Sequence, residues 1–391
     1  MATIRVGLIS APNFPAEIAE KLCDELPDIF VKYIDKETSW KVESTVDTLV
    51  GVAEETKEVL DNASNIKKDH NWDFVICLTD LPIFMKKKIV VGNASIKNKI
   101  GQVSVPAFGV MPMRKRIRVI IVELMKELYR NSERQPTRDD QTLVNGKDAA
   151  KNIGKQFYFS RVRRVEAAED DELDFRYIVR SAFIGYVRIL FGMTFANRPW
   201  AALLSFKKLV MLSFASGAYI SIFPNPWVLS VEYSPVRLSI LSLLSIFGMV
   251  IWIILTHNLW EKPSEHGKKR WRNLYNRTTF LTLTSIVVLN YLVLFSMFLA
   301  GMALLVPPEL FQLRTSVEGM PSFIYYIKLV WLITSCGTLA GAIGTGLESE
   351  ERIRNVTYSF RQQQRYYEIG EEENKEEKQD EDSDIEKRCS R

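Results

Sequence analysis

The chain has few histidines and cysteines, and it lacks the glycine-rich motifs of nucleotide-binding proteins. Its three histidines, His70, His257 and His266, are scattered, whereas a zinc site needs about three protein ligands around one ion. The four cysteines form no Cys-x-x-Cys pair and predict no disulfide framework. Neither Gly-x-Gly-x-x-Gly nor Gly-x-x-x-x-Gly-Lys occurs. The sequence therefore predicts no cofactor and no metal.

Two further absences narrow the class of protein. The net charge of +4 is too small to indicate a nucleic-acid partner, because the basic residues gather beside apolar segments. The opening residues, MATIRVGLISAP, lack the charged region and the long apolar stretch of a signal peptide. We expect them to form a strand that stays in the cytosol.

What the chain does contain is long apolar runs, and these lie in its second half. Four runs, at about 203–223, 236–257, 279–306 and 323–347, approach or exceed the roughly 20 residues that cross a bilayer. Lys207 and Lys208 lie inside the first run and would have to extend to one interface. The sequence predicts an all-α four-helix transmembrane bundle over residues 199–350, with the lipid bilayer as its partner.

The basic residues of the loops predict how this bundle is oriented. The loop between the third and fourth runs carries only Arg314, whereas the loop between the second and third carries six basic residues, Lys262, Lys268, Lys269, Arg270, Arg272 and Arg277. Because Lys and Arg are enriched in cytoplasmic loops, both termini are predicted to be cytosolic. Four residues fall where the runs meet the membrane interfaces: Arg198, Trp200, Trp260 and Trp271.

Small residues in the fourth run predict close helix packing. Gly337 and Gly341 are four residues apart, and Gly344 follows one turn later. This spacing lets helix backbones approach closely, either within the bundle or in a homo-oligomer formed through the fourth span. Since no acidic residue lies inside any of the four runs, an ion-coupled transporter is disfavoured.

Residues 1–130 alternate between strand and helix patterns. Strands are predicted at 4–11, 31–43 and 72–79, helices at 15–26, 46–66 and 114–130, and a hairpin at 88–93 and 101–105. Because helices separate the first three strands, we expect an α/β cytosolic domain with a mostly parallel sheet and a β-hairpin.

Short segments of this domain resemble the core of archaemetzincin-like zinc peptidases. They are Leu78-Thr79-Asp80-Leu81-Pro82, Val90-Val91-Gly92-Asn93 and Val103-Ser104-Val105, followed by an amphipathic helix. In those peptidases this helix carries His-Glu-x-x-His, but here the position reads Val122-Glu123-Leu124-Met125-Lys126. The resemblance implies a related fold without the metal ligands, so zinc peptidase activity is not expected. Glu123 is expected to be solvated or ion-paired.

The whole arrangement is also similar to a family of uncharacterised bacterial membrane proteins with four spans. The segments that carry this similarity are Cys77-Leu78-Thr79-Asp80-Leu81-Pro82, Ala196-Asn197-Arg198-Pro199-Trp200, Leu259-Trp260-Glu261-Lys262-Pro263, Leu274-Tyr275-Asn276 and Gly344-Thr345-Gly346-Leu347-Glu348-Ser349. The similarity implies a multi-pass protein of a bacterial plasma membrane, and it implies no particular activity.

The candidate contact residues follow two of the predicted strands. Ligands of open α/β sheets bind beyond the carboxyl ends of the strands, where this chain places Asn13, Thr79 and Asp80. Asp80 is the strongest candidate for a polar contact, and its alternative role is to cap a turn or a helix before Pro82. No catalytic residue is predicted, since Ser104 lacks a Gly-x-Ser-x-Gly turn.

The remaining segments connect or extend the two parts. Residues 131–176 are predicted to be a polar linker with one added strand, and 177–198 an amphipathic helix at the membrane interface. Residues 351–369 are expected to extend the last helix into the cytosol, and 370–391, with ten acidic and five basic side chains, to form a disordered tail.

Together these features predict a non-enzymatic, membrane-anchored adaptor or regulator whose cytosolic domain binds a protein or peptide partner. The alternative is a transporter or lipid-handling protein whose bundle is gated by the soluble domain.

Overall fold

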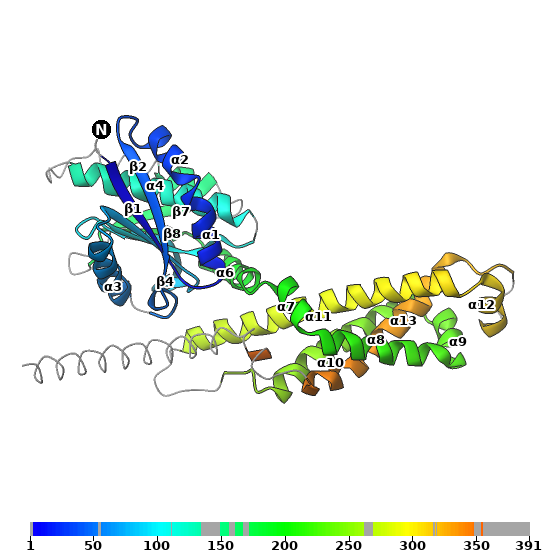
Figure 1. The fold of residues 1–391 in the computed structure, drawn as a ribbon. Helices are drawn as coiled ribbons and strands as arrows, with labels where there is room; N and C mark the ends of the chain where they lie inside the picture. Colours follow the sequence, from blue (N-terminus) through cyan, green and yellow to red (C-terminus); the bar gives the residue numbers. More distant parts are fainter. Residues whose placement is uncertain are drawn as a thin grey trace, which may run out of the picture. The chain divides into compact units, whose positions relative to one another are not determined.

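The computed structural model describes residues 3–53, 56–110, 112–133, 149–155, 161–166, 172–261, 269–315, 317, 319–347 and 353–354. The chain divides into two compact units, of which the first ends at Ala196 and the second begins at Asn197. Figure 1 shows a sheet with helices on both faces in the first unit and a bundle of helices in the second. The predicted tail 370–391, most of the extension 351–369 and residues 134–148 of the predicted linker lie outside the described residues.

The first unit is built around one mixed sheet of eight strands. The strands are β1 (Thr3–Ser10), β2 (Ser39–Val46), β3 (Phe74–Thr79), β4 (Ile83–Met85), β5 (Lys88–Ser95), β6 (Ile100–Ser104), β7 (Val162–Glu166) and β8 (Phe175–Val179). β2, β1, β3 and β6 pair in parallel, and β5, β8 and β7 continue the sheet with antiparallel pairing, while β4 pairs with β5. The expected mostly parallel sheet is therefore only partly observed. The parallel order ends at β6, because the tight turn after β5 forces the two strands of this hairpin to run antiparallel.

Helices cover both faces of this sheet (Figure 1). They are α1 (Phe14–Cys23), α2 (Leu26–Tyr33), α3 (Thr56–Asp69), α4 (Met113–Glu133), a short helix at 149–155, α6 (Ala182–Ala196) and the 3₁₀ turns η1 (Leu49–Gly51) and η2 (Val105–Phe108). α4 lies close to one face, since a Cβ added to Gly101 would come within 3.5 Å of the Leu124 side chain. On the other face, Ile9, Val75 and Cys77 form a core with residues of α3.

Two element boundaries differ from the prediction. Pro27 does not separate a helix from a strand, because proline is well placed in the first turn of a helix and α2 continues from it to Tyr33. The strand predicted at 31–43 is therefore β2, at Ser39–Val46. The helix predicted at 46–66 is α3, and it begins only at Thr56.

The first unit also extends well beyond the predicted boundary at residue 130. β7 and β8 add to the sheet, and Phe175 and Tyr177 of β8 are completely buried in it. Residues 177–198 are therefore not one interfacial helix: β8 ends at Val179, and α6 begins at Ala182 and contacts η2. α6 still exposes two large apolar side chains, Phe183 and Phe191.

The second unit consists of helices. They are α7 (Pro199–Ser205), α8 (Lys207–Ile222), α9 (Pro224–Glu232), α10 (Pro235–Thr256), α11 (Lys269–Leu305), α12 (Pro308–Thr315), α13 (Phe323–Gly341) and the 3₁₀ turn η3 (Ala342–Leu347). Three helical segments are long and apolar enough to cross a membrane: Pro235–Thr256, Trp271–Leu305 and Phe323–Gly344. A fourth span is present if the two segments Ala182–Leu203 and Lys207–Ile222, which are bent by 60° relative to each other, cross the membrane together. This composition is that of a multi-pass membrane protein.

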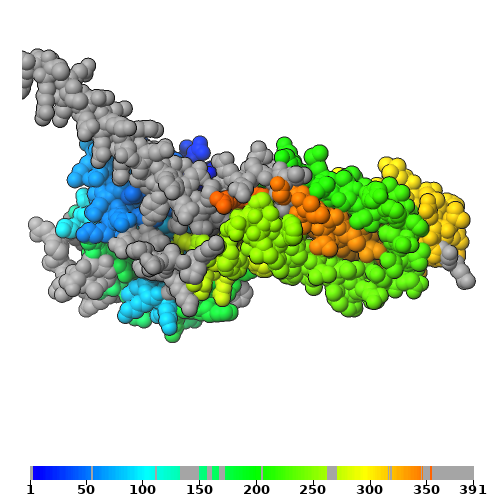
Figure 2. Space-filling view, turned by 90° about the horizontal axis from the view of Figure 1, so that it is seen from below, coloured from blue at the N-terminus to red at the C-terminus, as the bar shows by residue number. Residues whose placement is uncertain are grey.

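Two of the helices differ in their bounds from the spans predicted from the sequence. The first, at 203–223, is interrupted at Phe206, and Lys207 and Lys208 begin α8. The third is longer than its apolar run, because α11 already starts at Lys269 in the segment predicted as a loop. α13 is the central helix of the bundle, because 61% of its most apolar stretch is buried, against 33% in α10 and in α11. Figure 2 shows its remaining surface as a narrow orange strip between α8 and α10.

Candidate functional site

The three predicted contact residues occupy one edge of the sheet. β1 and β3 are parallel neighbours, and Ala11 N donates to Leu78 O at 2.9 Å where they end. Asn13 is exposed at the start of α1 with φ 69°. Thr79 is buried, and its hydroxyl accepts a hydrogen bond from the Leu81 amide at 3.0 Å, which is a turn-capping role. Asp80 is only 3% exposed. This burial leaves little of the Asp80 carboxylate for an external ligand.

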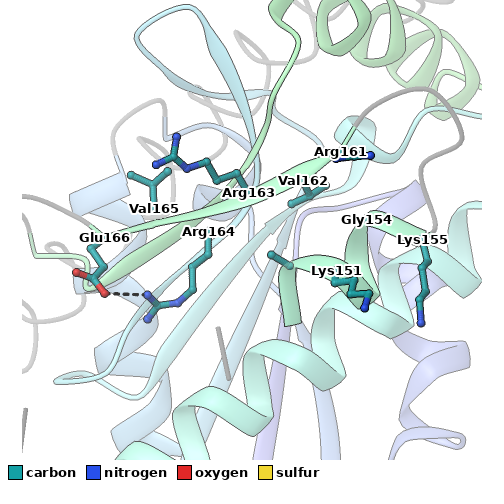
Figure 3. A pocket seen from close by; sticks show the side chains of 10 residues that line it. Lys151, Gly154, Lys155, Arg161, Val162, Arg163, Arg164, Val165 and Glu166 are labelled. Carbon is teal, nitrogen blue, oxygen red and sulfur yellow. Dashed lines mark hydrogen bonds and ion pairs between the residues drawn. The ribbon is translucent and has the colours of Figure 1, made fainter. Parts of the chain in front are cut away.

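A cavity of about 850 Å³ lies elsewhere in the first unit, between the helix 149–155 and β7. Figure 3 shows its lining, which consists of Ala150, Lys151, Gly154, Lys155, Arg161, Val162, Arg163, Arg164, Val165 and Glu166. Five of these side chains are basic and one is acidic. We call this cavity the β7 groove. Its volume is within the range of small-molecule and peptide pockets, and its charge favours an anionic occupant.

β7 is also the last strand of the sheet as far as the structure describes it. On its inner side the Arg161 carbonyl accepts a hydrogen bond from Arg180 N at 3.0 Å. In an antiparallel pair the backbone groups of alternate residues point to opposite sides. Those of Val162, Arg164 and Glu166 therefore point away from β8. An edge strand of this kind can pair with a further strand.

A buried ion pair supports β7 from inside. Arg164 Nε donates to Glu127 Oε2 of α4 at 3.1 Å, and Arg164 also contacts Glu166 at 3.1 Å. The hydroxyl of Tyr177 donates to Glu127. Burial raises the pKa of Glu127, and the Arg164 cation opposes that rise. Burial and the neighbouring Glu127 carboxylate raise the pKa of Tyr177. Arg164 is thus engaged in holding β7, which leaves four basic side chains for an occupant of the groove.

Glu123, one turn before Glu127 on α4, is ion-paired. Lys126 Nζ lies 3.0 Å from Glu123 Oε1, and Asn152 Nδ2 donates to the same oxygen at 3.4 Å. Glu123 is only 7% exposed, so of the two expected roles the ion-paired one is observed. Among the described residues, no group of three His, Cys, Asp or Glu side chains is placed to hold a metal ion.

The predicted interface residues lie at the ends of helices in the second unit. Arg198 adopts φ 51° and is the residue just before α7, and Trp200 in the first turn of that helix is 45% exposed. Trp260 follows α10 and is 50% exposed. Trp271 lies in the first turns of α11, with its ring 5.9 Å from that of Tyr275.

The three glycines of α13 and η3 lie against α8. A Cβ added to Gly337 would come 2.8 Å from Ser213 O and 3.1 Å from Gly217 Cα. A Cβ added to Gly341 would clash with Ser213 Oγ, and a Cβ added to Gly344 would clash with Leu212 Cδ2. This glycine face is therefore covered by a helix of the same chain.

The bundle also contains polar side chains in its interior. The hydroxyl oxygen of Tyr291 on α11 lies 2.9 Å from Ser242 Oγ of α10 and 2.9 Å from Ser335 Oγ of α13. Three helices therefore contribute to one cluster of hydroxyl groups. The adjacent Asn290 is completely buried, and neither atom of its amide has a hydrogen-bond partner among the described residues. An unpaired amide in an apolar bundle is energetically costly.

Comparisons with protein-family models, curated proteins and solved structures return no match. No family is shown. The resemblances carried by short sequence segments therefore stay predictions.

The β7 groove was not among the sites predicted from the sequence, because its residues fall in the segment taken as a linker. Two signals point to it in retrospect. Lys151 and Lys155 have the i, i+4 spacing that places side chains on one helix face. The run Arg161-Val162-Arg163-Arg164-Val165 places basic side chains on a strand. The fold joins these two signals in one site, because β7 pairs with β8 and lines the same cavity as the helix 149–155.

Proposed function

We propose that this protein is a membrane-anchored adaptor or regulator whose α/β unit binds an acidic segment of a partner protein along the β7 groove. The apolar helices of the second unit serve as its membrane anchor. The observation that carries the proposal is the excess of basic side chains in a groove that borders the last described strand of the sheet.

The charge of the groove supports an acidic occupant. Lys151, Lys155, Arg161 and Arg163 have no acidic partner in the described part of the chain. Holding four like charges around one groove without counter-charges costs repulsion, which a polyanionic ligand relieves. The charged pairs would also accelerate association and make binding sensitive to salt.

The backbone of the groove supports an extended peptide over a compact anion. A peptide that adds as a strand beside β7 would pair with the outward backbone groups of Val162, Arg164 and Glu166, and such main-chain hydrogen bonds supply affinity in strand addition. Alternate side chains of an added strand point to one face. Acidic residues at every second position would therefore all lie on one face, which can be the face of Lys151 and Lys155 on the helix 149–155 (Figure 3).

The test is binding of a fluorescent peptide of alternating glutamate and valine to the full-length protein in detergent. We expect saturable binding that weakens with salt, and a loss of about tenfold in affinity in the Lys151→Glu/Lys155→Glu variant, because two attractions become repulsions. Lys68→Glu, at an exposed position on α3, is the matched control and should bind as the unmodified protein does.

Two results would refute the proposal. One is equal affinity for a peptide of alternating lysine and valine. The other is unchanged affinity in the double variant, provided that its thermal unfolding matches that of Lys68→Glu.

The alternative, a transporter or lipid-handling bundle, is favoured by a separate observation, the buried and unpaired amide of Asn290 beside the Tyr291 cluster. Polar groups inside a membrane bundle often mark solute pathways. If the protein reconstituted in liposomes moves a polar solute and Asn290→Leu stops that movement, the bundle is the working part and the adaptor proposal is displaced.

A further inference from the structure

A second cavity, of about 530 Å³, lies in the membrane unit where α10 ends and α11 begins. We call it the α10–α11 cavity. It is lined by Ile254, Leu255, Asn258, Trp260, Glu261, Arg272, Asn273, Asn276 and Arg277. Its occupant is independent of the function proposed for the β7 groove, because the two cavities belong to different units of the chain.

The floor of this cavity is held by specific backbone contacts. Asn258 adopts φ 50°, and α10 ends in hydrogen bonds from Asn258 N to Leu255 O at 3.4 Å and from Leu259 N to Ile254 O at 3.1 Å. This pattern is a Schellman helix end, in which a left-handed residue reverses the chain. Asn276 of α11 then fixes the next segment, since its side chain accepts from Glu261 N at 2.9 Å and donates to Glu261 O at 3.4 Å. The cavity is therefore preorganised.

The polar lining suits a phosphodiester that carries hydroxyl groups. Arg272 and Arg277 supply two guanidinium groups, the side-chain type that matches the geometry of phosphate oxygens. Asn258 and Asn273 are exposed amides that can donate or accept. Glu261 is the single acidic residue of the lining and can accept hydrogen bonds from hydroxyl groups. The two arginines outnumber this carboxylate, so an occupant with one negative charge is favoured.

The surroundings favour a lipid over a free anion. The cavity is at the end of the apolar part of α10, and Ile251, Trp252 and Leu255 in the last turns of that helix are 51%, 48% and 69% exposed. These apolar side chains continue from the cavity along the helix surface, where acyl chains would lie. Trp260, half-exposed at the rim, is the residue type enriched at the headgroup level of membranes. Basic pockets between membrane helices are known to hold lipid headgroups.

We propose that the α10–α11 cavity binds the headgroup of an anionic phospholipid with a hydroxylated headgroup, such as phosphatidylglycerol. Arg272 and Arg277 bind the phosphate, Asn258, Asn273 and Glu261 bind the headgroup hydroxyls, and the acyl chains lie on the exposed apolar face of α10.

The experiment is native mass spectrometry of the full-length protein in detergent with equimolar phosphatidylglycerol, phosphatidylethanolamine and phosphatidylcholine. We expect one retained phosphatidylglycerol, preferred over phosphatidylcholine by at least about tenfold. Both lipids carry the phosphate, but phosphatidylcholine lacks the hydroxyl groups that the cavity binds, and the two arginines repel its ammonium group. Arg272→Gln should abolish the preference. Arg237→Gln, at the opposite end of α10, is the matched control and should keep it, and Asn273→Asp provides a second, exposed substitution that introduces repulsion.

Three outcomes would overturn the proposal. The first is equal retention of the three lipids by the unmodified protein. The second is loss of the preference in Arg237→Gln, or its persistence in both Arg272→Gln and Asn273→Asp, because the arginines of this cavity would then not decide it. The third is displacement of the lipid by an excess of glycerol phosphate, because the site would then recognise a free phosphate compound and not a membrane lipid.

Discussion

At the scale of single residues, several charged side chains that stabilise the first unit are partly or fully buried. Glu127 is buried and shares its carboxylate between Arg164 and Tyr177. Breaking such a pair from one side leaves an uncompensated charge, which costs more than the pair itself contributes. Among the residues around the β7 groove, Arg164 therefore stabilises the fold, whereas others are proposed to bind a ligand. Single substitutions can distinguish these two roles.

Arg164→Leu tests the buried pair. At pH 7.5 we expect a loss of about 3–5 kcal/mol in the free energy of unfolding, because Glu127 is left charged without its cation. Without Arg164 the folded-state pKa of Glu127 rises further, so the penalty grows as pH rises and shrinks as pH falls towards the unfolded value of the carboxyl. Denaturation followed at pH 7.5 and at pH 5 should show the smaller loss at pH 5.

The control for that substitution is Arg163→Leu, on the opposite face of the same strand. Arg163 is exposed and has no ion pair in the described part of the chain, so its loss should change stability by less than about 0.5 kcal/mol. Adding Glu127→Gln to Arg164→Leu should restore most of the stability. If the double variant is no more stable than Arg164→Leu, the buried carboxylate is not the cause of the loss.

The contacts of Glu43 predict that the first unit loses stability in acid for a separate reason. Its carboxylate is 2.7 Å from Lys41 Nζ, accepts from Trp72 Nε1 at 2.7 Å and also contacts Arg5, and these partners lower its pKa to about 2. A lowered pKa stabilises the fold above the unfolded value and loses that contribution as pH falls from about 4.5 towards about 2. Glu43→Gln should therefore unfold at a lower temperature than the unmodified protein near neutral pH.

Differential scanning fluorimetry over this pH range would check the response. The difference in unfolding temperature between the unmodified protein and Glu43→Gln should narrow as pH falls below 4.5. Glu58→Gln, exposed on α3, should track the unmodified protein throughout. A gap that stays constant with pH would contradict the proposed cause.

At the scale of elements, close contacts between backbones decide which helices pack together. α13 lies in the middle of the bundle, and its glycine face meets Ser213 and Gly217 of α8. Only small residues on both helices allow this approach. In the first unit, by contrast, Gly101 of β6 leaves room for side chains, those of Ile76 and of Leu124 on α4.

Gly337→Ala tests the α8–α13 contact. The added methyl would lie 2.8 Å from the carbonyl oxygen of Ser213, and a backbone atom cannot move aside cheaply, so we expect a loss of about 1–3 kcal/mol. Gly301→Ala on α11 is the matched control, because nothing lies within 4 Å of its added methyl. That control should be neutral or stabilising, since alanine favours a helix by about 1 kcal/mol over glycine. Thermal unfolding in detergent measures both, and equal effects at the two positions would contradict the contact.

At the scale of the whole molecule, the two units place different demands on their surroundings. The first has a buried core and a polar surface, whereas the second exposes large apolar side chains along α10 and α11, such as Leu244, Leu255 and Leu292. A surface of this kind is stable in lipid and aggregates in water. The orientation proposed from the basic loops can therefore be tested by which side of the membrane each part faces.

Cysteine labelling on intact cells provides that test. In a cysteine-free background, Met320→Cys in the α12–α13 turn should react with an impermeant maleimide from outside, because that loop is predicted to be external. Lys36→Cys, exposed in the α/β unit, should react only after the cells are permeabilised. Both sites are open to solvent in the structure, so burial does not confound the comparison. The reverse labelling pattern would contradict the predicted orientation and would indicate that the α/β unit faces the outside.

The sequence by itself determined the parts whose signal is local. Apolar length identified the spans that became α10, α11 and α13, and strand and helix periodicity identified β1, β3, the β5–β6 hairpin and α4. These patterns survive because each depends on residues a few positions apart. Proline misled the prediction at Pro27, since a proline disrupts the interior of a helix but is well placed in its first turn, where Pro27 lies in α2.

The tertiary structure decided what depends on distant pairing. β8 joins β5 across some 80 residues of chain, and β7 joins β8, so a segment taken as a linker became the edge of the sheet and one wall of a basic groove. Asn276 likewise fixes Glu261 beyond the end of α10, which builds the α10–α11 cavity from two segments that no local pattern connects. Local propensity sets the elements, but a site forms only where the fold brings separate side chains together, and that follows from pairing energies summed over the whole chain.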